Sequence, residues 1–213
     1  MAAGLRERKK LRTHQLIFEA AARLFEARGF DGVTISEVAH EADVSEMTVY
    51  KHFPTKEDLV FSGLIAFEER LVDAVRERAP GESPLDACRR LLLDSSRLES
   101  DAVAELIRKG AVLMRGSAAL QTRELQVMNA YTEQLAELLA EETAAAPDDV
   151  EPRSVAQALI GTHRALVLHI RHQVLAGRHG PQLAAGARAQ AAHAFARLDR
   201  GLAEFAVRPL AVS

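Results

Sequence analysis

Apolar residues recur along most of the chain at three- and four-residue intervals, the spacing of amphipathic helices. From residue 12 to residue 28 this pattern predicts one helix, and Gly29 provides its C-terminal stop. Thr34, with Glu37 three residues later, forms a capping box in front of a second, short helix. Ser45 caps a third helix, with Thr48 in place of the glutamate. No segment shows a convincing strand pattern, so the sequence predicts an all-α fold.

Breaker residues divide the remainder into longer helices. After Pro54, a helix over about residues 55–78 has a length that suits a connector, and Ser83 with Pro84 begins the next one. Further helices are predicted over about residues 102–114, 118–143, 152–176 and 181–206. The pattern therefore predicts about nine helices. They form a head at residues 1–54 and a larger helical body at residues 55–213, with helix 55–78 as connector.

Composition places the chain among ordinary globular proteins. Its 213 residues are 48% hydrophobic and 27% charged. A single cysteine, Cys88, excludes an internal disulfide and a multi-thiolate zinc site, and in an apolar helix it is expected to be an inert core thiol. No uncharged apolar run reaches the length of a membrane span, so we expect a cytoplasmic protein without a membrane partner.

Bulk charge does not indicate a nucleic-acid binder, because the formal net charge is -3. The N-terminus is nevertheless strongly basic, with a single acid, Glu7, among Arg6, Arg8, Lys9, Lys10 and Arg12. Such a density suits an arm that touches phosphates, and it equally suits a frayed, solvated terminus.

The segment from Phe30 to Leu59 carries the clearest functional signal. The second and third predicted helices are separated by only Ala42-Asp43-Val44. This spacing predicts a helix-turn-helix, in which the third helix enters the major groove of DNA. In that last helix, Val49 and Phe53 fall where the helix must pack against the two before it. The remaining positions of this helix are polar or exposed, as a surface that reads base edges requires.

The ordered motifs of this region resemble those of the tetracycline-repressor (TetR) family of bacterial regulators. They are Phe25, Gly29-Phe30, Thr34-Ile35-Ser36-Glu37-Val38-Ala39, Ala42-Asp43-Val44-Ser45, Thr48-Val49-Tyr50-Lys51-His52-Phe53 and Lys56-Glu57-Asp58-Leu59. The resemblance covers about residues 12–60. It implies a homodimeric repressor, not an enzyme, that binds a two-fold symmetric operator in double-stranded DNA and is released by a small-molecule effector. Glu46 and Met47 depart from the family's usual pattern and leave the operator sequence open.

The same resemblance, read with the chemistry of each side chain, divides the DNA contacts into two kinds. Phosphate contacts are assigned to Thr34, Tyr50, His52 and Lys56. Base reading is assigned to Ser45, Glu46, Met47, Thr48 and Lys51, where lysine donates to guanine and methionine covers a thymine methyl. Two alternatives remain: Glu46 as an acid that satisfies the helix dipole, and Tyr50 as a partly buried core residue.

The body supplies candidates for an effector site and for a dimer interface. A mostly apolar set with few polar groups is assigned to a small-molecule pocket: Leu92, Leu106, Leu113, Met114, Met128, Tyr131 and His163. Apolar stripes of the last two helices are assigned to an intersubunit four-helix bundle: Leu159, Leu166, Phe195, Leu198, Leu202 and Phe205. Each residue in the two sets has plain core packing as its alternative.

Other chemistries have little support in the sequence. His169 and His172 have a spacing that can bind a metal, but no carboxylate lies between Glu151 and Asp199 to complete a site, so we predict no metal and no cofactor. No phosphate loop or nucleophile motif is present. The competing hypothesis is a metabolite-binding enzyme or carrier whose N-terminal helices merely cap the body.

Overall fold

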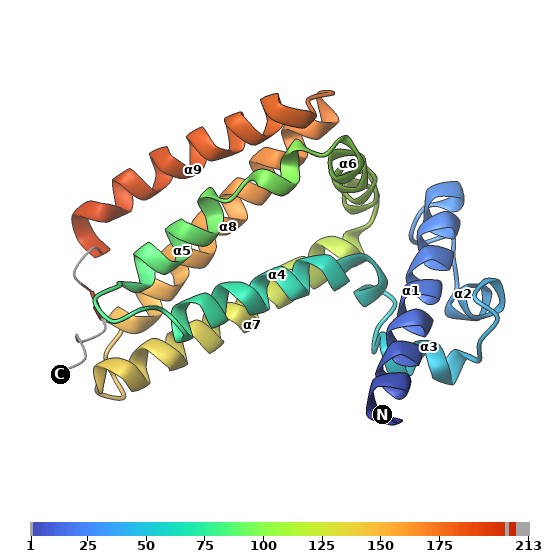
Figure 1. The fold of residues 1–213 in the computed structure, drawn as a ribbon, viewed down its shortest axis with the longest axis horizontal. Coiled ribbons are helices and arrows are strands. Elements are labelled where there is room, and N and C mark those ends of the chain that lie inside the picture. Colours follow the sequence, from blue (N-terminus) through green and yellow to red (C-terminus); the bar gives the residue numbers. More distant parts are fainter. Residues whose placement is uncertain (1, 203–204, 208–213) are drawn as a thin grey trace. The chain divides into compact units, whose positions relative to one another are not determined.

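The computed structural model describes residues 2–202 and 205–207, without the side chains of residues 2, 3, 5, 6 and 62–68. This part of the chain is helical and contains no strand, which confirms the predicted all-α class. Figure 1 labels the helices in chain order. They are α1 (Ala2–Arg28), α2 (Ile35–Glu41), α3 (Glu46–His52), α4 (Asp58–Arg76), α5 (Pro84–Leu93), the 3-10 helix η1 (Ser96–Glu99), α6 (Asp101–Gly116), α7 (Ala118–Thr143), α8 (Glu151–Leu175) and α9 (Gly180–Leu202).

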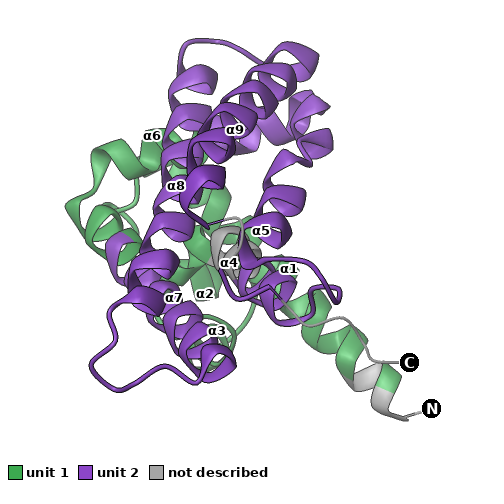
Figure 2. Cartoon of the chain, turned by 90° about the vertical axis from the view of Figure 1, so that its left-hand side faces the viewer, with its two compact units in different colours: residues 1–64, 109–124 green, residues 65–108, 125–213 purple. Residues whose placement is uncertain are grey.

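The chain divides into two compact units, coloured separately in Figure 2. Unit 1 comprises Met1–Leu64 and Lys109–Glu124, and unit 2 comprises Ile65–Arg108 and Leu125–Ser213. Three helices therefore belong partly to each unit: α4, α6 and α7. The domain boundary predicted after residue 54 places residues 55–64 and 109–124 in the body, whereas the packing groups them with the N-terminal helices.

Helix starts follow the local chemistry of the sequence. The side-chain oxygen of Thr34 accepts from the backbone N–H of Glu37, whose carboxylate accepts from the N–H of Thr34, so the predicted capping box is confirmed. Ser83 caps α5 with Pro84 at its first position, also as predicted. Each cap satisfies an N–H group that the first helical turn would otherwise leave unpaired.

Two differences from the predicted elements have physical causes. Helix α1 begins at Ala2 and not near residue 12, because the basic N-terminal residues are good helix formers and continue the helix that follows. The short η1 was not predicted, since four residues are too few to show a periodicity. The other helices start and end within a few residues of the predicted positions.

Unit 1 has an aromatic core at the centre of its N-terminal helices. Phe25 and Phe30 lie with ring centroids 5.2 Å apart, and both side chains are buried. Between them the chain turns at Gly29, whose φ of +73° favours glycine. Val49 of α3 and Phe53, the residue that follows the helix as its C-cap, are also buried, which confirms that this face of α3 packs inward.

Unit 2 is built from the remaining parts of α4, α6 and α7 together with α5, α8 and α9. Helix α9 packs along both α5 and α8. Cys88 is completely buried in α5, as expected of a core thiol. Near the end of α4, buried Arg78 donates to the carboxylate of Glu142 and to the carbonyl oxygens of Val75 and Ala206, so that one side chain joins three segments.

Candidate DNA interface

The turn between α2 and α3 has the geometry of a helix-turn-helix. Its backbone N–H groups bond back to α2, from Ala42 to Val38 at 3.0 Å and from Val44 to Ala39 at 3.0 Å. Asp43 adopts the left-handed region with φ of +53°, a conformation that aspartate tolerates better than most residues. The chain thereby turns within three residues and leads directly into α3.

Most of the assigned contact residues in α3 lie on the surface of the protein. Met47 is 77% exposed and Tyr50 is 47% exposed, while Val49 on the opposite face is 0% exposed. Ser45, Glu46 and Lys51 are exposed, and Thr48 and His52 are half-buried. The structure therefore brings seven of the assigned residues onto one short helix and its cap. The exposure of Tyr50 argues against a core role.

Hydrogen bonds within the protein involve three of the hydroxyl groups assigned to DNA contact, those of Thr34, Ser45 and Thr48. The Ser45 hydroxyl accepts from the N–H of Thr48 and lies 2.9 Å from the Thr48 hydroxyl. The Thr34 hydroxyl donates to the Glu37 carboxylate at 2.9 Å. The Thr34 hydroxyl can donate to a phosphate only if its hydrogen leaves the Glu37 carboxylate, because a hydroxyl has a single donor hydrogen.

Lys56 lies in the turn that precedes α4, and not within the first turn of the helix as expected. Its ammonium nitrogen is 4.2 Å from the centroid of the Phe30 ring, a cation–π contact that holds the stem of the side chain against the head. The turn is closed by Thr55 and Asp58, which form a reciprocal pair of hydrogen bonds between side chain and backbone N–H.

Ion pairs between α1 and α2 position the helix-turn-helix. Arg28 donates to Glu37 at 2.7 Å, and Arg23 donates to Glu41 at 3.1 Å. The hydrogen bond from Arg28 is the largest cause that lowers the pKa of Glu37 to about 2, followed by the hydrogen bonds from Thr34. Glu37 therefore remains ionised and both caps α2 and pairs with α1.

Three polar contacts attach the segment 109–124 to the N-terminal helices within unit 1. Lys109 of α6 donates to Glu26 of α1 at 2.8 Å, and Ser117 donates to Asp31 at 2.9 Å. Arg123 of α7 donates to Asp58 at 2.9 Å. No sequence pattern indicates these pairs, because their members are more than sixty residues apart.

A group of basic side chains from α1 and α3 was also not predicted from the sequence. The ring of His14 lies 4.4 Å from the Phe53 ring and 6.0 Å from the His52 ring, measured between centroids. Lys10 lies one helical turn before His14. The only signal in the sequence was the basic N-terminal run, which ends two residues before His14.

The residues assigned to an effector pocket are divided between the two units. Leu113 and Met114 belong to unit 1, and the other five belong to unit 2. Within unit 2, Met128 and Tyr131 of α7 and His163 of α8 are buried. Leu106, by contrast, is 55% exposed.

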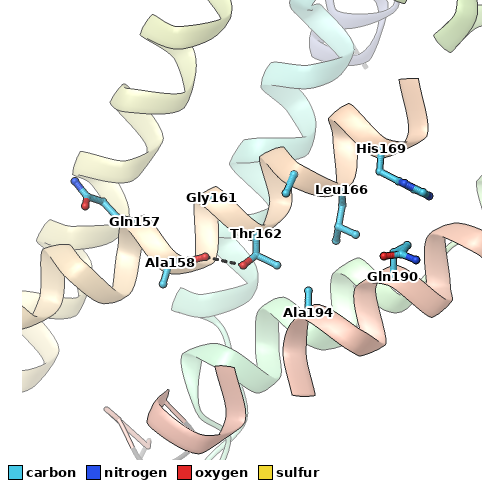
Figure 3. Close-up of a pocket in the computed structure, with 9 residues that line it drawn as sticks. Gln157, Ala158, Gly161, Thr162, Leu166, His169, Gln190 and Ala194 are labelled. Carbon is cyan, nitrogen blue, oxygen red and sulfur yellow. Dashed lines mark hydrogen bonds between the residues drawn. The ribbon is translucent and has the colours of Figure 1, made fainter. Parts of the chain in front are cut away.

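A surface groove of about 360 Å³ lies between α8 and α9 in unit 2. Figure 3 shows residues that line it. Small side chains line much of it, including Ala158, Gly161, Ala165 and Ala194. His169 faces the groove, whereas His163 is buried, so the two histidines lie on different faces of α8. In the described part of the chain, no three ligating side chains gather as a metal site would require.

The residues assigned to a dimer interface differ in their accessibility. Leu159, Leu166 and Phe195 are buried within the chain itself. Leu198, Leu202 and Phe205 are half-buried. Only the second group retains surface that a partner would cover.

The geometry of α1 to α3 is that of a helix-turn-helix head, and comparison with known proteins agrees. Residues 17–62 match the model for bacterial regulatory proteins of the tetR family, and residues 82–203 match the model of the MftR C-terminal domain. The chain therefore belongs to the TetR family and is a transcriptional regulator, not an enzyme. Among the described residues, no helix is both long and apolar enough to cross a membrane.

Individual relatives match different lengths of the chain. The transcriptional regulator TcmR of Streptomyces glaucescens is 34% identical over 84 residues, which are 39% of this chain and 37% of TcmR. The transcriptional repressor KstR of Rhodococcus jostii is 29% identical over 138 residues, which are 64% of this chain and 60% of KstR. The chain thus spans less than two thirds of either relative.

Similarity to solved structures supports the fold. GusR of Salmonella enterica superimposes with a TM-score of 0.54 at 21% identity, over 90% of this chain and 96% of GusR.

Proposed function

We propose that this regulator represses transcription by binding a two-fold symmetric operator as a homodimer and that a largely hydrophobic small molecule releases it. The observation that supports the DNA-binding step is the division of α3 into a buried and an exposed face. One of its faces is buried through Val49, and the opposite face exposes Met47, Tyr50 and Lys51. A helix presented in this way can enter the major groove without disturbing the core of the head.

The proposed contacts fall into two classes. Tyr50, His52 and Lys56 grip phosphates, together with Thr34 at the start of α2. Lys51 donates to a guanine, Met47 covers a thymine methyl, and Ser45, Glu46 and Thr48 contribute to the remaining base selection. Phosphate contacts fix the position of α3, and base contacts select the sequence.

Dimerisation is assigned to α8 and α9. Support comes from the small residues that line the groove between these helices, because small side chains let the helices of a partner approach closely. Leu198 and Leu202 follow Gln190 and Ala194 along α9 at four-residue intervals, which extends the groove with apolar surface. A symmetric interface would bury this surface on both copies.

The effector is assigned to the body around Met128, Tyr131 and His163, which are buried in unit 2 and include two side chains with polar groups. Because α4, α6 and α7 belong partly to each unit, a ligand that favours one arrangement of the body can act on the DNA head through them. A hundredfold loss of operator affinity requires about 2.7 kcal/mol of differential binding. The effector must then bind the operator complex about a hundredfold more weakly than the free protein, and equal affinities would exclude a candidate.

DNA binding is tested by titrating the protein with the DNA upstream of its own gene at several salt concentrations. We expect affinity to fall steeply with salt, because each phosphate contact releases counterions. Lys51→Ala should weaken binding to this DNA, while Arg178→Ala, which removes an exposed positive charge between α8 and α9, serves as the matched control. Binding that is unaffected by salt and equal for both variants would reject the proposed function.

A further inference from the structure

The contact between His14 and His52 joins the two helices at the surface of the DNA head. The two rings meet edge to face, with centroids 6.0 Å apart and an interplanar angle of 67°. Beneath them, the ring of Phe53 packs against His14 and is itself buried. Both imidazoles are half-buried, so each rests on the core and keeps part of its edge open to solvent.

The electrostatic surroundings of this pair are cationic. Lys10 of α1 acts on both histidines, and Lys51 of α3 acts on His52. Burial is the largest cause that lowers the pKa of each histidine. The charge of Lys10 adds to it for His14, and for His52 the other charges are those of His14, Lys10 and Lys51. No carboxylate of the described residues is among the groups that shift either histidine.

We propose that Lys10, His14 and His52 form one binding site for a backbone phosphate of DNA and that occupation of this site takes up a proton on the histidine pair. The proposal rests on the DNA-binding function proposed above, which already assigns His52 to a phosphate; Lys10, His14 and the proton are new. The proton comes from solvent and is held on an imidazole nitrogen.

A phosphate is the ligand that this arrangement suits. Its oxygens are acceptors only, and the site offers the ammonium donors of Lys10 with ring N–H donors from two histidines. In the free protein the neutral form of the histidines is favoured, because protonation of both would place three positive charges side by side, on Lys10, His14 and His52. A bound phosphate reverses that balance, because a negative charge beside an imidazole favours the protonated form.

The position of the site favours DNA over a free anion. His52 is the last residue of α3, and Tyr50 and Lys51 beside it belong to the surface proposed to face the groove. Lys10 extends this surface along α1, so the basic N-terminal segment contributes through a helix and not through a flexible arm.

The test measures affinity for a short random-sequence duplex at low salt as a function of pH, since a phosphate contact does not depend on sequence. Between about pH 7.5 and about pH 6 we expect the affinity of the unmodified protein to rise, by at most about tenfold per pH unit for each proton taken up. His14→Gln with His52→Gln should flatten this dependence, and Lys10→Gln should lower the salt slope by about one. His40→Gln, at an exposed histidine of α2, is the matched control and should retain the dependence.

A second measurement uses the unmodified protein, so its result does not depend on whether the variants fold. Nuclear magnetic resonance titration of the unmodified protein should show the pKa of His14 or His52 rising when the duplex is added. A pH dependence that persists in the double variant, or histidines that titrate identically with and without DNA, would overturn the phosphate site but leave the proposed function standing. Absence of any binding to DNA would overturn both.

Discussion

Arg123 of α7 donates two hydrogen bonds to one oxygen of Asp58, the first residue of α4, at 2.9 Å from Nη2 and 3.3 Å from Nε. The other carboxylate oxygen of Asp58 accepts from the backbone N–H of Thr55. A single buried carboxylate thus closes the turn that carries Lys56 and holds the start of α7 against the start of α4.

Loss of this pair should destabilise the protein. Arg123→Ala leaves the carboxylate of Asp58, whose side chain is 9% exposed, without its charged partner. We expect the free energy of unfolding to fall by roughly 1–3 kcal/mol. Arg153→Ala is the control, because Arg153 pairs with Glu133 at the surface and should contribute at most about 1 kcal/mol. Denaturant unfolding measures both; equal losses would show that burial of Asp58 has no energetic consequence.

The α2 capping box should respond to acid. The pKa of Glu37 is lowered from 4.5 to about 2, so its contribution to stability is present above about pH 4.5 and is lost as the pH falls towards 2. Glu37→Gln should therefore be less stable than the unmodified protein near neutral pH, and the difference should shrink over this range. Thermal unfolding at several pH values checks this, with Glu19→Gln as an exposed control on α1. A Glu37→Gln deficit that stays constant down to about pH 2 would refute the assignment.

Substitutions in the DNA interface should produce two patterns. Tyr50→Phe and Lys56→Ala should weaken binding to every duplex alike, because they remove phosphate contacts. Lys51→Ala should instead relax the preference at one base pair by about 1–3 kcal/mol. Binding measured on an operator and on its single-base variants distinguishes the patterns. If Lys56→Ala changes neither affinity nor salt slope, the turn before α4 does not contact DNA.

The groove between α8 and α9 predicts the effect of a bulky charge on assembly. Ala165 is exposed and lines this groove, so Ala165→Arg should convert a dimer into monomers without disturbing the core. Ala102→Arg, at an exposed position of α6, should leave assembly unchanged. Sedimentation at micromolar concentration measures the result, and a monomeric unmodified protein would contradict both dimerisation and the two-fold operator.

Local chemistry determined much of this protein. The helix periodicity, the caps at Thr34, Ser45 and Ser83, and the stop at Gly29 specify the helices, because each depends on residues within a few positions of one another. The division of α3 into a buried and an exposed face was predicted for the same reason: Val49 and Phe53 are one helical turn apart.

Tertiary structure decided the remainder, since it depends on which distant residues meet. The periodicity of α9 marks Phe195 as apolar, but only packing shows that it is buried within its own chain while Leu198 keeps accessible surface. The pairing of Arg123 with Asp58 and the contact of His14 with His52 join residues 65 and 38 positions apart, and the spacing along a single helix carries no information about such contacts. The sequence by itself therefore determined the helices and the polar face of α3, and the packing of distant helices decided which charged groups share one site.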